Sequence, residues 1–253
     1  KIAYPNGLTH DLNPTSFGSY KIDEKGDALT LTQTPKVVNA VRKYLPRLLD
    51  GDPCTDLPSG TELERRLDEL KLPDASQRTV KLSPEQKLCQ QVCGDMKYFE
   101  QGSMPQIAID LHRLSCVVAF APPNTLPLCL AVLRNAYSFR EVGIVYHRNR
   151  PEPPRPFVGQ RCDMRLADGA PIAEIECAGD AATGDKHVFG GVITFCGAAV
   201  LTLHKKIACA VGNTMEAEQV AACRMSEKLV YGVIALKAMG YHVKEPVRLL
   251  TDN

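Results

Sequence analysis

The stretch TMEAEQVAACRMSEKLVYGVIALKAMG, residues 214–240, decides how the second half of this chain folds. Its apolar side chains recur at the spacing of a helix and form one broad stripe. The stripe consists of Val220, Cys223, Val230, Val233, Ile234 and Ala238. Gly240 is well placed to end the helix, because glycine readily adopts the left-handed backbone of a C-terminal cap. The pattern predicts a long helix from Thr214 to Met239.

Strand-like segments flank this helix on both sides. Three of them precede it, with glycines at the turns: Ile172–Cys177, Gly191–Phe195 and Val200–His204. A fourth, Val247–Leu250, follows it. If the first three strands are antiparallel, a right-handed crossover through the helix brings the fourth beside the first and parallel to it. The predicted fold class of this half is therefore α/β, a mixed sheet with a crossover helix.

Acidic residues fall at three junctions of this predicted unit. Asp180 follows the first strand, Glu216 opens the helix and Asp252 ends the fourth strand. At one end of a sheet the three carboxylates would raise one another's pKa unless cations compensated them. Hard oxygen ligands suit Mg²⁺, and two such ions about 4 Å apart activate water for phosphodiester cleavage.

Each acid also has a purely local interpretation. Asp180 follows Gly179 and suits a turn, as does Asp252 before Asn253. Glu216 lies three residues after Asn213, the spacing of a helix capping box. Sequence spacing alone leaves both interpretations open.

Read in order, these segments resemble the ribonuclease H domain of copia-type retrotransposon polyproteins. The family's D-A-x-x-G-N/D strand corresponds to residues 180–185, and its T-x-E-A-E helix start to residues 214–218. A glycine-led second strand (190–194), the lysine pair Lys205 and Lys206, and a strand ending in D-N (249–253) follow the same order. The resemblance implies two Mg²⁺ ions held by Asp180, Glu216 and Asp252, and an RNA/DNA hybrid as the substrate.

The upstream half resembles the end of the preceding reverse transcriptase. ALTLTQ (28–33) is similar to the family's LTLSQ segment, and residues 105–115 and 133–146 to its PDIAFAVSRLS, VLRYL and GLVY stretches. The resemblance implies a mostly helical region of palm remnant, thumb and connection over residues 1–150. A proline-rich linker (151–160) and a ribonuclease H-like domain, C-terminally truncated (161–253), would follow.

The sequence also departs from the family. The tyrosine and paired aspartates of the polymerase site are absent, and so are the last strand and the fourth acid of the nuclease. We therefore expect no polymerase activity. We also expect an open sheet edge that a partner protein could cover.

Local patterns in the first half predict its elements. Ser19–Asp23 and Ala28–Thr32 form a predicted hairpin. Val37–Leu49 reads as a helix that Pro46 must kink or divide. Further helices are predicted from Pro84, with Ser83 as the N-cap, and over Pro105–Phe120 and Leu126–Tyr137.

The bulk composition is that of a globular protein, with 44% hydrophobic and 23% charged residues. A net charge of +1 gives no global positive field, so nucleic-acid binding would need local patches. The candidate contact residues are Lys36, Arg42, Lys43, Arg47, Arg148 and Arg150. A solvated face or linker explains these cations equally well.

The ten cysteines show no metal-binding spacing, and Cys89 and Cys93 read as core residues at helical spacing. We expect reduced thiols, an intracellular location and no membrane span. Two hypotheses follow. The first is a ribonuclease H-type endonuclease. The second is a domesticated, inactive fragment that serves as a scaffold subunit.

Overall fold

The computed structural model describes residues 2–3, 9–10, 16–17, 19–26, 28–74, 82–147, 172–173, 175–182, 187–195, 197–243 and 247–251. The chain divides into two compact units, Lys1–Val145 and Tyr146–Asn253. The predicted linker, residues 151–160, lies outside the described residues. Both helices and sheets are present, which agrees with the predicted α/β class.

The first unit begins with small strands and the predicted hairpin. Strands β1 (Ile2–Ala3) and β2 (Thr9–His10) pair with each other, and β3 (Ser16–Phe17) pairs with β4 (Tyr20–Lys25). Strand β4 pairs with β5 (Ala28–Thr32) in antiparallel register, which confirms the hairpin. Gly26 sits in the turn with φ +62°, a conformation that glycine adopts without strain. Strand β6 (Ile144–His147) lies beside β5.

Proline positions set the boundaries of the next helices. Helix α1 (Thr34–Tyr44) stops before the short 3₁₀ helix η1 (Pro46–Leu48), so Pro46 divides the predicted helix.

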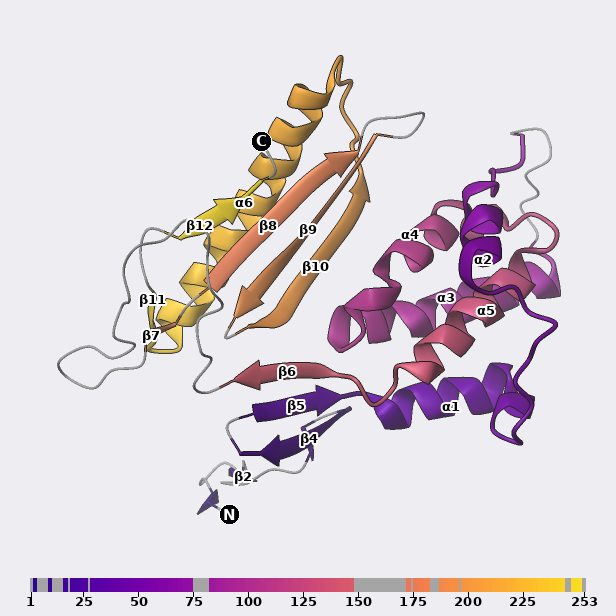
Figure 1. The fold of residues 1–253 in the computed structure, drawn as a ribbon, viewed down its shortest axis with the longest axis horizontal. Helices are drawn as coiled ribbons and strands as arrows, with labels where there is room; N and C mark the ends of the chain where they lie inside the picture. Colours follow the sequence, from indigo (N-terminus) through magenta and orange to yellow (C-terminus); the bar gives the residue numbers. More distant parts are fainter. Residues whose placement is uncertain are drawn as a thin grey trace. The chain divides into compact units, whose positions relative to one another are not determined.

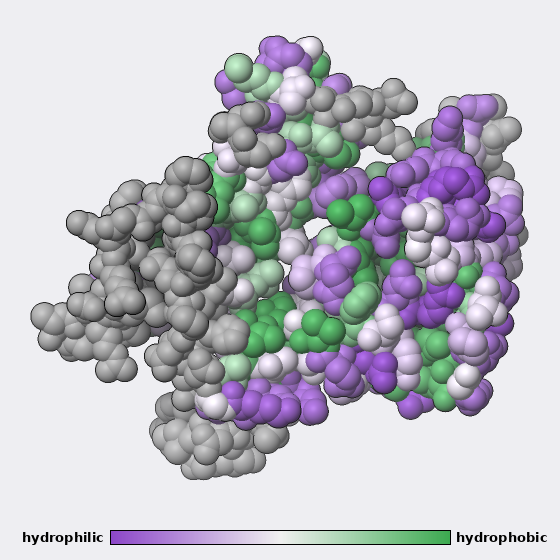
Figure 2. Space-filling model, in the orientation of Figure 1, coloured by the Kyte–Doolittle hydropathy of each residue, from purple (hydrophilic) through white to green (hydrophobic). Residues whose placement is uncertain are grey.

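Helix α2 (Gly60–Asp68) was not predicted. Its only buried side chains are Leu63 and Leu67, and two apolar residues are too few to indicate a helix. The visible surface over α2 is strongly hydrophilic (Figure 2).

Helix α3 (Pro84–Gly102) begins at Ser83, the predicted N-cap, and the two bonds there form a capping box. The Gln86 N–H donates to Ser83 Oγ at 3.1 Å, and the Ser83 N–H donates to Gln86 Oε1 at 2.9 Å. The predicted helix over Pro105–Phe120 is three consecutive pieces: η3 (Pro105–Ile107), α4 (Ala108–Val117) and η4 (Val118–Phe120). Helix α5 (Thr125–Ser138) completes the unit as predicted.

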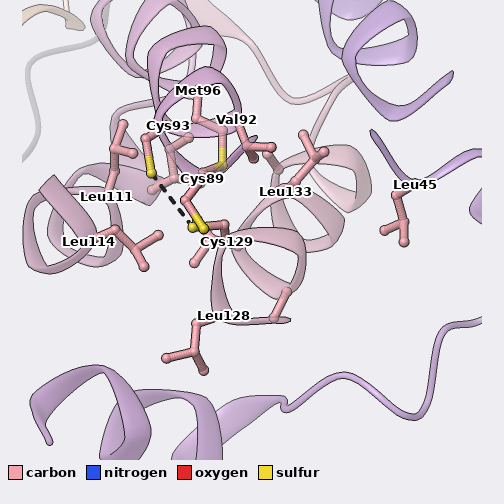
Figure 3. Packing of buried hydrophobic residues seen from close by; sticks show 14 of the residues in the cluster. Leu45, Cys89, Val92, Cys93, Met96, Leu111, Leu114, Leu128, Cys129 and Leu133 are labelled. Carbon is pink, nitrogen blue, oxygen red and sulfur yellow. Dashed lines mark hydrogen bonds between the residues drawn. The ribbon is translucent and has the colours of Figure 1, made fainter. Parts of the chain in front are cut away.

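The core of the first unit lies where α3, α4 and α5 meet (Figure 3). Cys89 and Cys93 are buried there, as the sequence predicts, and Cys93 Sγ lies 3.7 Å from Cys129 Sγ. Free cysteine packs like a small apolar residue. These thiols thus join the leucines, valines and Met96 that fill the cluster.

The second unit has the predicted sheet topology. Strands β8 (Ile175–Ala182), β9 (Val188–Phe195) and β10 (Ala198–Lys206) are successively antiparallel. After helix α6 (Thr214–Ala238), β12 (Arg248–Leu250) pairs parallel to β8. The strand order among the described residues is β10-β9-β8-β12, with α6 along the sheet (Figure 1). The two-residue strands β7 (Ile172–Ala173) and β11 (His242–Val243) also pair in parallel.

Glycines let α6 approach the sheet closely. A Cβ at Gly179 would lie 2.8 Å from Met225 Cγ, and one at Gly191 only 2.5 Å from Met225 Cε. The buried side of α6 consists of Ala217, Ala221, Met225, Leu229 and Leu236. Gly240, with φ +87°, follows the helix as predicted.

The apolar stripe predicted on this helix is mostly not the side that packs on the sheet. Val230 and Ile234 are 55% and 58% exposed, and Cys223 and Ala238 are also exposed. Val220 and Val233 are half-buried at the margin of the core. Helix α6 is therefore apolar on two sides.

None of the helices in the described part of the chain combines the length and apolar character needed to cross a bilayer.

Candidate functional site

In the second unit, one face of the sheet packs on α6 and the other face carries Asp180. Gly179 and Gly191 approach Met225 and so face α6. Because successive residues of a strand point to opposite faces, Asp180 and Gly190 point away from α6. Asp180 is exposed and lies inside β8, opposite Gly190 in the register, rather than after the strand as predicted. The turn interpretation of Asp180 is therefore wrong.

His204 shares a row of the sheet with Asp180. Gly190 of β9 pairs with Asp180 on one side and with His204 of β10 on the other. The His204 Cδ2 atom lies 3.5 Å from the position of a Cβ at Gly190, so the imidazole lies over this glycine, on the face that carries Asp180. Sequence reasoning placed His204 in a strand but not beside an acid. Only the strand register, with a glycine in the middle position, shows this row.

Glu216 is held in the first turn of α6 by capping hydrogen bonds. Its N–H donates to Asn213 Oδ1 at 2.9 Å, and its Oε2 accepts from the Gly212 N–H at 2.7 Å. The bond from the Glu216 N–H satisfies one of the donors that the helix start leaves unpaired, and the bond from the Gly212 N–H ties the preceding residue to the first turn. The local interpretation of Glu216 is thus confirmed, with the difference that the carboxylate bonds to Gly212 and not to the Asn213 backbone.

The start of α6 and Asp180 lie at the same end of the sheet. Ala217, next to Glu216, is buried in one cluster with Ala181, next to Asp180, and with Phe189 of β9. The backbone therefore brings the two acidic positions to the same end of the sheet, but Asp180 lies on the face opposite the one that α6 covers. Strand β12 runs toward this end as well, because it is parallel to β8 and its Leu250 lies beside Ala178. Asp252 itself lies outside the described residues.

A metal site requires several ligands at one point. In the part of the chain that the structure describes, no group of three or more His, Cys, Asp or Glu side chains is placed to hold a metal ion. Asp180 and Glu216, the two described members of the predicted set, have carboxylate oxygens, which are the donors that Mg²⁺ prefers.

The predicted basic residues of the first unit have mixed surroundings. Arg47 contacts Asp56 at 2.6 Å and Asp52 at 3.5 Å. The hydrogen bond from Arg47 lowers the pKa of the Asp56 carboxyl below its usual value. Lys43 donates to the Tyr44 hydroxyl at 2.6 Å and lies 3.7 Å from Asp95. Nearby acids thus offset the charge at two of the four positions.

The other two cations of this group lie on α1. Arg42 donates to Asn39 Oδ1 at 2.7 Å, a neutral partner, and Lys36 is exposed. Both keep a positive charge that is available to bind a phosphate. Arg148 and Arg150 lie outside the described residues.

Comparisons of the chain with protein-family models, with curated proteins and with solved structures found no match.

Proposed function

We propose that the chain is a retroelement-derived ribonuclease H module that hydrolyses the RNA strand of RNA/DNA hybrids with Mg²⁺ and has no polymerase site of its own. One observation carries this proposal. Three antiparallel strands, a crossover helix and a fourth strand parallel to the first bring Asp180 and the start of α6 to one end of the sheet. This is the order of elements that the copia-type resemblance implies.

Asp180, Glu216 and Asp252 would hold the cations in this proposal. When bound, two Mg²⁺ ions supply an activated water and neutralise charge on the leaving oxygen. Asp180 is exposed on the face of the sheet opposite α6, so it and Glu216 could share cations only at the end of the sheet where both positions lie. Glu216 Oε2 holds the Gly212 N–H at 2.7 Å, whereas Oε1 has only a 3.5 Å contact with Asn213. One oxygen of Glu216 can therefore serve the cap while the other binds a cation.

Lys36, Arg42, Lys43, Arg47, Arg148 and Arg150 are the proposed contacts to the hybrid's phosphates. Among the four that the structure describes, Lys36 and Arg42 are the stronger candidates, because Lys43 and Arg47 already have carboxylates nearby.

A second candidate is a catalytically inactive, domesticated fragment that acts as a scaffold subunit. The hydrogen bonds of Glu216 support it, because they give this acid a structural role without any metal. Strand β12 also supports it. This strand has only three residues and is the last strand of the sheet among the described residues, so a partner's strand could add to it.

Hybrid cleavage in Mg²⁺ separates the two candidates. We expect the parent chain to cleave the RNA strand and Asp180→Asn to lose more than about 100-fold in rate, because even loss of a residue that only orients a metal ligand typically costs 10- to 100-fold. Asp23→Asn, a change at a partly exposed acid of the first unit, is the matched control and should keep full activity.

Circular dichroism must show that all three proteins are folded. A folded parent chain without cleavage would reject the nuclease and favour the scaffold. Equal rates for the parent and Asp180→Asn would point to a contaminating nuclease.

A further inference from the structure

The outer side of α6, away from the sheet, is unusually apolar for an exposed surface. Val230, Tyr231 and Ile234 are 55%, 66% and 58% exposed. They continue an apolar row that includes Cys223 and Ala238, both also exposed. The apolar side of a helix normally packs against another part of the protein or a partner. Contiguous exposed apolar surface of this kind marks an interaction site.

The orientation of this side is fixed by Gly232. A Cβ at Gly232 would lie 2.9 Å from Ile175 Cδ1 of β8, so Gly232 faces the sheet. Successive helical residues are about 100° apart, which places Val230 and Ile234 about 20° to either side of the direction opposite Gly232. These two side chains are therefore at the centre of the outer side.

The same side is complementary to itself in charge. Glu227 precedes Gly232 by five residues and Lys237 follows it by five (232 − 227 = 5; 237 − 232 = 5). At about 100° per residue, this pair straddles the same outward direction as Val230 and Ile234. In an antiparallel arrangement about a two-fold axis at the level of Gly232, Val230 packs beside the second copy's Ile234. Glu227 then lies beside the second copy's Lys237.

We infer that the outer side of α6 is the interface of a homodimer, in which a second copy of this chain covers it with its own α6 in antiparallel orientation. Two-fold symmetry requires one self-complementary surface, and Glu227, Val230, Ile234 and Lys237 provide it. The present partner of Glu227 is Arg224 on the same helix, at 3.2 Å. Both residues of that pair are well exposed, so exchanging it for a contact across the dimer loses little.

Analytical ultracentrifugation of the full chain tests this interface. We expect the mass to rise with concentration from 27.7 kDa toward twice that value. Ile234→Glu should weaken dimerisation by at least about tenfold, since it buries an unpaired charge at the centre of the contact. Ile109→Glu is the matched control. Ile109 is 53% exposed on α4 in the first unit, and its replacement should leave the mass curve unchanged.

Charge reversal tests the antiparallel pairing itself. Glu227→Lys should weaken the dimer, because it sets a lysine against the second copy's Lys237. The double variant Glu227→Lys, Lys237→Glu should recover most of the parent affinity. Recovery of this kind would not follow from a parallel arrangement or from a surface used for another protein.

Three outcomes would overturn the inference. The first is a chain that stays monomeric at high micromolar concentration, which would mean that a different protein binds the outer side of α6. The second is a dimer that Ile234→Glu does not weaken. The third is a monomeric chain whose melting temperature falls with Ile234→Glu but not with Ile109→Glu, which would mean that another part of the same chain covers α6.

Discussion

Gly190 and Gly191 are neighbours in β9, yet their surroundings are opposite. A Cβ at Gly191 would lie 2.5 Å from both Met225 Cε and Met225 Sδ and 2.8 Å from the Ala178 carbonyl oxygen. At Gly190 the nearest atoms are 3.5 Å away, an ordinary contact distance. The glycine at 191 is thus required by the close approach of helix and sheet, whereas the glycine at 190 is not required by packing.

Alanine substitutions at these two positions should therefore have different effects on the free energy of unfolding. Gly191→Ala should lower the free energy of unfolding by about 1–3 kcal/mol, because backbone lies close to the new methyl and only Met225 can give way. Gly190→Ala should be neutral or stabilising by about 0.5 kcal/mol, since alanine restricts the unfolded chain. Urea unfolding followed by circular dichroism measures both. Equal destabilisation would mean that α6 does not pack on β9 at this distance.

Residue identity alone gave a good prediction for the caps but not for Asp180. Ser83 with Gln86, and Asn213 with Glu216, are recognisable because capping depends on spacing along the chain. Asp180 looked like a turn residue because it follows glycine, yet it lies inside a paired strand. Its place beside Gly190 and His204 depends on strand register, which short-range patterns do not encode.

Among the elements, helix α6 has several structural roles at once. It packs on the sheet through small residues and Met225, exposes an apolar outer side, and carries Glu216 in its first turn. The helix itself was predictable from length and caps. Which side faces the sheet was not, because both sides are apolar and the glycines that select one of them lie on β8 and β9.

Glu216 allows its capping and catalytic roles to be separated. Glu216→Gln keeps an oxygen that can accept from the Gly212 N–H but removes the charge. Its unfolding free energy should fall by no more than about 1 kcal/mol, the value of a charge at a helix N-terminus. Hybrid cleavage should fall by orders of magnitude if the carboxylate binds a cation.

Glu216→Ala is the comparison for this test, because it removes both the hydrogen bond and the charge. It should be less stable than Glu216→Gln by about 1 kcal/mol and equally inactive. A Gln variant as active as the parent would leave Glu216 with the capping role alone.

Helix α2 shows where element prediction fails. Its sequence, GTELERRLD, offers only Leu63 and Leu67 as a buried pair, and its charges bond with one another on the surface. Two leucines are too few to establish a period, so the surrounding α4 and α5 determine this helix as much as its own residues do.

At the scale of the whole molecule, the charge balance limits how the chain could hold a nucleic acid. The net charge is +1, and Arg47 and Lys43 have acidic neighbours. Attraction to phosphates must then come from a few cations without such neighbours, and we expect a shallow dependence of hybrid affinity on salt.

Fluorescence anisotropy with a labelled hybrid in EDTA, where no cleavage occurs, measures this dependence. Lys36→Ala should lower the slope of log affinity against log salt by about 1, as expected for loss of one phosphate contact. Arg47→Ala should change it less, because Asp52 and Asp56 already offset that charge. Lys25→Ala, at an exposed lysine near Asp23, should change nothing. Equal effects of all three would exclude a localised contact surface.

The pairing of β12 with β8 also has a consequence for the order in which the second unit folds. Arg248 pairs with Glu176 across 72 positions of sequence (248 − 176 = 72), whereas β8, β9 and β10 pair through short connections. Contacts between distant segments form late, because a long loop must close first. We expect the three-stranded meander to fold early and β12 to join last, so that the neighbourhood of Asp180 is completed only in the final step and is the first to open under mild denaturant.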